Sequence, residues 1–105
     1  MIAEAAIREA VQLLKKAANP VKIILFGSYA TGKADENSDL DFLVVEKELK
    51  ARRMEMVRLR RILSPLRIPI DIIVVSERVF NDWADTPGTV IYEATLEGRV
   101  LYETS

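Results

Sequence analysis

Apolar residues recur along this 105-residue chain with two different spacings. Near the start they repeat every three or four positions between Ile7 and Ala17, which predicts a helix that ends at Asn19 and Pro20. Three later runs are almost continuously apolar and rich in β-branched residues, which is typical of buried strands: residues 21–26, 39–45 and 68–75. A second helix is predicted between the last two runs, from about Glu48 to Ser64, with Leu49, Met56, Leu59 and Leu63 on its inner face.

The last third of the chain carries clear start and stop signals. Ser76 is placed to cap a short helix that runs through Trp83, and Pro87-Gly88 breaks it. A last helix is expected over residues 89–97, before Gly98, and residues 100–102 can add an edge strand. Because helices connect the strands, we predict an α/β (α+β) fold, a small mixed β-sheet flanked by helices, with residues 1–105 as one domain.

Composition removes several classes of chemistry. The chain has no Cys, which excludes a disulfide framework and thiolate catalysis. It has no His either, which excludes serine-type triads and zinc-helix proteases. No signal peptide and no long apolar span is visible, so a cytoplasmic protein without a membrane partner is expected. At this length we expect no second, substrate-binding domain.

Charge is uneven although the formal total is only −1. Basic residues crowd positions 47–67 and acidic ones follow from 77 to 103. The basic segment has two interpretations, an exposed helix face in solvent or a docking surface for an acidic partner. Because broad nucleic-acid binding draws on a large basic excess, no direct nucleic-acid binding is expected.

The segment GSYATGKADENSDLD, residues 27–41, carries the chemistry. Gly27 and Ser28 follow the first strand, where glycine allows a backbone to approach a phosphate closely, although an ordinary turn would look the same. Asp39 and Asp41 lie two residues apart, so strand alternation puts both carboxylates on one face, roughly 7 Å apart. They could be a solvated face, but two acids entering an apolar strand favour a bound divalent cation.

A third carboxylate strengthens the metal hypothesis. Asp71 is the only charged residue inside the run 68–75. If that strand pairs beside the strand of Asp41, Asp71 completes a triad of the kind used in phosphoryl and nucleotidyl transfer. The alternative is an Asp at a strand end that accepts a hydrogen bond from a neighbouring amide.

These residues resemble the nucleotidyltransferase superfamily that includes DNA polymerase beta, whose pattern is Gly-Ser, a short spacer, Asp-x-Asp and a later Asp. The small size and the C-terminal segment from Thr86 to Tyr102 look like the minimal nucleotidyltransferases (MNT) of toxin and antitoxin modules. Their partner is a HEPN-domain ribonuclease toxin, which makes this chain the antitoxin by resemblance. Many members have Arg before the second glycine, where this chain has Thr31.

The resemblance implies a polymerase beta-like fold and a magnesium-dependent transfer of AMP, or another NMP, from ATP or another NTP. Two Mg²⁺ ions would be held by Asp39, Asp41 and Asp71, with Asp71 also receiving the proton. The nucleotide-binding residues would be Gly27, Ser28, Gly32 and Ser38. The acceptor implied is a tyrosine hydroxyl of the HEPN toxin, in a homo- or hetero-oligomer.

Two other functions remain open at this point. A binding-only antitoxin would neutralise its toxin by occlusion, which the missing Arg at Thr31 favours and the three intact acids oppose. A small-molecule transferase, like the aminoglycoside nucleotidyltransferases, would need more surface to enclose its substrate than one small domain offers.

Overall fold

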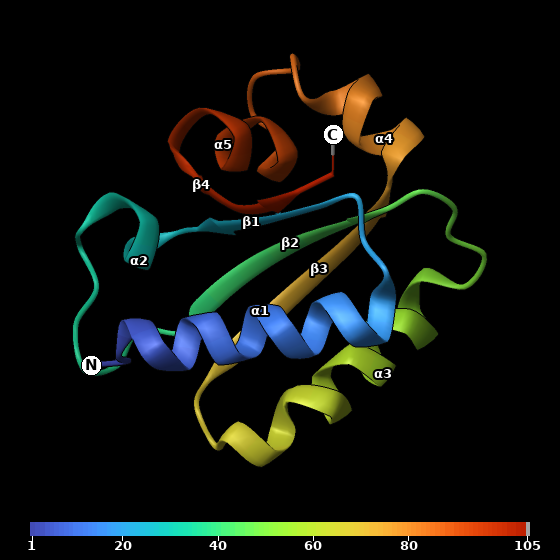
Figure 1. Ribbon diagram of the computed structural model, residues 1–105. Helices are drawn as coiled ribbons and strands as arrows, with labels where there is room; N and C mark the ends of the chain where they lie inside the picture. Colours follow the sequence, from blue (N-terminus) through green and yellow to red (C-terminus); the bar gives the residue numbers. More distant parts are fainter. Residues whose placement is uncertain (105) are drawn as a thin grey trace.

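A computed structural model of the protein describes residues 1–104, in which helices cover both faces of one sheet (Figure 1). In chain order the elements are α1 (Glu4–Ala18), β1 (Lys22–Phe26), α2 (Ser28–Thr31), β2 (Leu40–Glu46), α3 (Arg52–Leu63), the 3-10 turn η1 (Ser64–Leu66), β3 (Ile70–Ser76), α4 (Glu77–Trp83), α5 (Val90–Glu97) and β4 (Arg99–Glu103). None of the helices within residues 1–104 has the length and apolar character to cross a bilayer.

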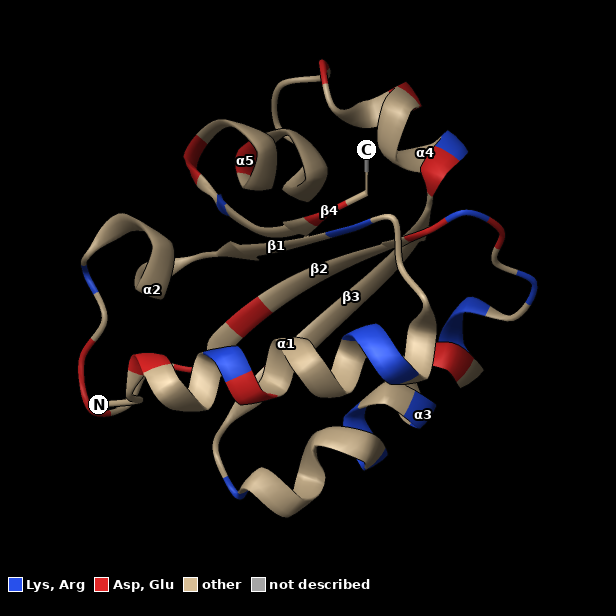
Figure 2. Ribbon diagram, viewed as in Figure 1, with Lys and Arg blue, Asp and Glu red and all other residues tan. Residues whose placement is uncertain are grey.

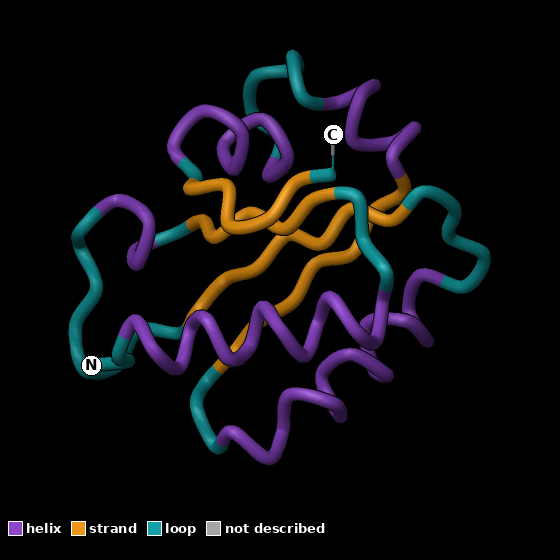
Figure 3. The backbone as a smooth tube through the Cα atoms, in the orientation of Figure 1, coloured by secondary structure: helices purple, strands orange, loops and turns teal. Residues whose placement is uncertain are grey.

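The sheet is mixed, as predicted. Over the described residues its four strands lie in the order β3-β2-β1-β4. The inner strand β1 is antiparallel to both β2 and β4, whereas β2 and β3 are parallel and connected through α3 (Figure 3). A parallel pair needs such a crossover, and the helical pattern between the two apolar runs supplies it. The predicted edge strand is β4.

Side-chain alternation divides the core between the two faces of the sheet. Leu40, Phe42 and Val44 of β2 pack with buried residues of α1 and α3 on one face. Leu43 and Val45 pack with buried residues of α4 and α5 on the other. Because both faces of β2 are covered, its sequence is almost continuously apolar instead of alternating. The carboxylates of this strand therefore have to lie at its ends.

The helix boundaries mostly follow the sequence signals. Asn19 ends α1 in the left-handed conformation with φ 46°, and the Ser76 hydroxyl accepts a hydrogen bond from the Val79 amide at the start of α4. Two predictions were wrong in detail. The second helix begins at Arg52 and not near Glu48, because residues 47–51 carry the chain from the end of β2 to the helical layer. Ser28 starts a short helix, α2, where a turn was expected.

Candidate functional site

The end of β1 is closed by a backbone conformation that only glycine adopts readily. Gly27 has φ 73° and ψ −155° and precedes the first residue of α2, Ser28. A Cβ atom added at Gly27 would collide with Oδ2 of Asp41. The glycine therefore lets the strand end pass directly against a carboxylate, and it brings the Gly-Ser pair beside Asp41, one of the three predicted acids.

The acids meet because of strand register. Phe26, the residue before Gly27, pairs with Asp41 across β1 and β2, and Asp41 pairs in turn with Asp71 across the parallel strands β2 and β3. Asp39 lies two residues before Asp41, just outside β2, and is exposed. The predicted pairing of the two strands is thus confirmed, and it puts Asp41 beside Asp71.

The electrostatics of the site act on Asp41. Burial raises the pKa of Asp41, and the negative charges of Asp71 and then Asp39 raise it further. Like charges near a partly buried carboxylate oppose its ionised form. A cation bound among the three would relieve this repulsion, and carboxylate oxygens are the ligands that Mg²⁺ prefers.

Arg60 of α3 was not anticipated at this site. Its Nη2 donates to Oδ1 of Asp71 at 2.9 Å, and both side chains are about half exposed. Within residues 1–104, no three acidic side chains are gathered closely enough to hold one metal ion. In this conformation the Asp71 carboxylate is ion-paired with the Arg60 guanidinium. An exposed ion pair of this kind contributes at most about 1 kcal/mol, so it is easily exchanged for another partner.

Two of the predicted nucleotide-binding residues have local roles. Gly32 is the C-cap of α2 and has a left-handed conformation with φ 78°. Its amide donates a hydrogen bond to the carbonyl of Ser28, the first residue of that helix. Ser38 belongs to a turn in which its hydroxyl accepts from the Asp35 amide at 2.9 Å. Thr31 is exposed and its hydroxyl donates to the Gly27 carbonyl at 3.4 Å. The structure thus brings Gly27 close to Asp41, while Gly32 and Ser38 belong to the segment between α2 and β2.

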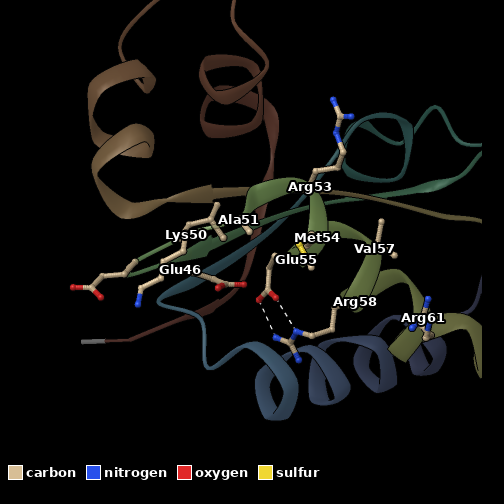
Figure 4. Close-up of a pocket in the computed structure, with 11 residues that line it drawn as sticks. Glu46, Lys50, Ala51, Arg53, Met54, Glu55, Val57, Arg58 and Arg61 are labelled. Atoms are coloured by element: carbon tan, nitrogen blue, oxygen red, sulfur yellow. Dashed lines mark hydrogen bonds and ion pairs between the residues drawn. The ribbon is translucent and has the colours of Figure 1, made fainter.

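A second polar cluster lies at the end of β2 opposite Asp41. It was not predicted from the sequence. The Glu46 side chain is buried against Glu55 of α3, and Arg58 holds Glu55 through two hydrogen bonds of 2.7 and 2.8 Å (Figure 4). Arg58 also donates to the Ala17 carbonyl in the last turn of α1. The sequence pattern does not distinguish Glu46, Glu55 and Arg58 from the exposed charged residues around them. Their contacts depend on how α1 and α3 pack against β2. Their contacts tie α1, α3 and β2 together.

Charged residues on the surface are distributed as expected. Figure 2 shows Lys and Arg along α3 and its flanks, with acidic residues on α5. Most basic side chains of α3 are exposed, which either interpretation of this segment requires.

Comparison with known proteins identifies relatives of the whole chain. The family described as "Polymerase beta, Nucleotidyltransferase" matches residues 8–105. A Methanocaldococcus jannaschii protein, MJ0604, is 37% identical over 105 residues, which cover 94% of this chain and 97% of that protein. A second protein of this organism, MJ1305, is 51% identical over 41 residues, but the match spans only 28% of its length. Both relatives carry the name "putative protein adenylyltransferase".

Solved structures share the fold. One, described as a toxin-antitoxin with AMP-PNP, superposes with a TM-score of 0.68 at 21% identity and covers 99% of this chain and 76% of that one. Another is an MNT antitoxin complex with a tri-AMPylated HEPN toxin of Shewanella oneidensis. Its TM-score is 0.63 at 18% identity, over 96% of this chain and 72% of that one.

Proposed function

This chain belongs to the polymerase beta nucleotidyltransferase family, and we propose that it transfers AMP from ATP to a hydroxyl of a HEPN-domain toxin, which it thereby neutralises. The observation that carries this proposal is the alignment of Asp41 with Asp71 beside the Gly27-Ser28 strand end. The name of the full-length relative and the AMPylated toxin in one structural neighbour support the choice of AMP and of a protein acceptor.

Asp39, Asp41 and Asp71 are the residues that would hold Mg²⁺. They supply only hard oxygen donors, and a bound cation would oppose the burial and the negative charges that raise the pKa of Asp41. When bound, Mg²⁺ would neutralise charge on the triphosphate and lower the pKa of the acceptor hydroxyl. For Asp71 to act as a ligand, its Oδ1 has to exchange Arg60 for the cation.

The reaction forms one bond and breaks one. The acceptor oxygen attacks the α-phosphorus, the bond from this phosphorus to the bridging oxygen breaks, and pyrophosphate leaves. Ser28 and the amides around Gly27 hold the β- and γ-phosphates and so orient the leaving group. We assign the proton of the acceptor hydroxyl to Oδ2 of Asp71, because the cation would replace Arg60 at Oδ1 and the chain has no histidine.

Intact mass spectrometry tests the proposal. The purified chain is mixed with Mg-ATP and its proposed HEPN-domain partner, and both masses are recorded. We expect the partner to gain one or more AMP units, and Asp39→Asn/Asp41→Asn to abolish the gain. Asp82→Asn/Asp85→Asn makes the same chemical change at two exposed acids and should transfer normally. An unchanged partner mass with the parent chain would refute the proposal.

The second candidate is an antitoxin that acts by occlusion alone. Thr31 favours it, because this residue bonds only to carbonyls of its own short helix and supplies no cation to a phosphate. The same variant separates the two functions. A toxin that stays neutralised by Asp39→Asn/Asp41→Asn, without any gain of mass, would establish occlusion.

A further inference from the structure

An open apolar groove lies between β3 and the helical layer of α4 and α5. Its volume is about 420 Å³, and its walls include Ile73, Val75, Val79, Trp83 and Val90. Three of these large side chains are well exposed: Val79 by 39%, Trp83 by 47% and Val90 by 43%. Single exposed apolar residues are common, but several around one groove mark an interaction site.

The groove lies on the same face of the sheet as the candidate active site. Asp71, Ile73 and Val75 alternate along β3 and so share one face of the sheet, the face covered by α4 and α5. Ile73 lies roughly 7 Å along the strand from Asp71, since each strand residue advances about 3.3 Å. An acceptor that occupies the groove therefore lies on the same face of the sheet as Asp71, one side-chain repeat along β3 from it.

The order of the strands gives the direction from which an acceptor must come. In the proposed reaction the pyrophosphate is held at Gly27 and Ser28, at the end of β1, while the carboxylates stand on β2 and β3. Attack in line with the leaving group puts the acceptor oxygen on the far side of the α-phosphorus. In the order β3-β2-β1 this side is β3, where Asp71 and the groove lie.

We propose that this groove binds an apolar segment of the protein acceptor, next to the residue whose hydroxyl is modified. This inference rests on the proposed function. Among residues 1–104, Arg52 is the only charged residue that lines the groove, and its Nε donates to the Val74 carbonyl of the edge strand. The wall therefore suits an apolar segment with neutral or acidic neighbours. The hydroxyls of Ser76 and Thr89 already cap α4 and α5, which leaves few polar groups to recognise a nucleotide base.

Steady-state kinetics of AMP transfer test the groove. Trp83→Ala removes its largest side chain, and Val79→Glu puts a charge in it without removing a core residue. We expect either variant to raise KM for the HEPN-domain protein at least about tenfold, the scale of an interface anchor, and to leave KM for ATP unchanged. Leu96→Ala is the matched control, because Leu96 is 64% exposed outside the groove and should behave like the parent.

The outcomes separate this inference from the function on which it rests. If the parent chain transfers no AMP, the proposed function itself is wrong. If the parent transfers AMP and the variants raise KM for ATP and not for the protein, the groove holds the nucleotide and the inference is overturned. Unchanged values of both constants in Trp83→Ala and Val79→Glu would overturn it as well.

Discussion

Gly27 determines both the backbone path at the end of β1 and the space available to the Asp41 carboxylate. Gly27 combines a φ of 73° with a ψ of −155°, a region that is essentially closed to other residues. The space beside its Cα is filled by the Asp41 carboxylate. The position of that carboxylate and the direction in which the chain leaves β1 are therefore set by the same residue. A side chain at position 27 has to disturb both at once.

Replacing this glycine should damage folding and transfer together. In Gly27→Ala we expect a loss of about 1–3 kcal/mol in the free energy of unfolding, from backbone strain. Because the new methyl group displaces the Asp41 carboxylate, we expect AMP transfer to fall about 100-fold. Urea denaturation and the initial rate of transfer measure the two effects.

Gly32→Ala separates strain from displacement. Gly32 also has a positive φ, 78°, but no atom lies within 4 Å of the position of an added Cβ. We expect this variant to lose about 1 kcal/mol of stability and to keep most of its transfer activity. Equal losses of activity in both variants would show that strain, and not the contact with Asp41, explains the effect.

At the scale of elements, the sequence predicted the features that depend on local residue patterns, namely strands and helix boundaries. The strand β2 was recognisable because both of its faces are buried, and the cap at Ser76 because its hydroxyl precedes a helix. The cap at Thr89 was not predicted, since residue 89 was expected to be the first residue of the last helix. The pairing of Asp41 with Asp71 followed once the two strands were assumed to be neighbours. Arg60 could not be predicted, since its ion pair with Asp71 depends on how α3 packs beside β3.

The cap of α5 allows a quantitative test. Thr89 Oγ1 accepts a hydrogen bond from the Tyr92 amide at 3.1 Å, at the start of a helix of 8 residues. We expect Thr89→Ala to lower the free energy of unfolding by about 1 kcal/mol, the usual loss for a helix cap. Thr89→Ser keeps the acceptor oxygen and should retain most of the stability. Urea denaturation compares the three proteins, and equal losses in Ala and Ser would rule out the cap as the cause.

At the scale of the whole molecule, a cluster of charged residues at the end of β2 opposite Asp41 joins α1, α3 and the sheet, and the proposed reaction does not use it. Arg58 bridges Glu55 and the last turn of α1, while Glu46 of β2 is only 8% exposed. Among the described residues, Oε2 of Glu46 has no hydrogen-bond partner. Burial, and after it the neighbouring Glu55 carboxylate, raise the pKa of Glu46 to about 8. The bonds with Arg58 hold the pKa of Glu55 below its usual range.

The stability of the protein should therefore fall as pH rises through neutrality. Between the ordinary value of 4.5 and about 8, folded Glu46 keeps a proton that the unfolded chain releases, so the free energy of unfolding decreases with pH over this interval. We expect a decrease on the order of 2 kcal/mol from pH 5 to pH 8. The side chain in Glu46→Gln cannot ionise, so this variant should lose most of the decrease. The free energy of unfolding is measured by urea denaturation at the two pH values. Glu48→Gln, at an exposed neighbour, should follow the parent. A decrease that persists in Glu46→Gln would assign the titration to another group.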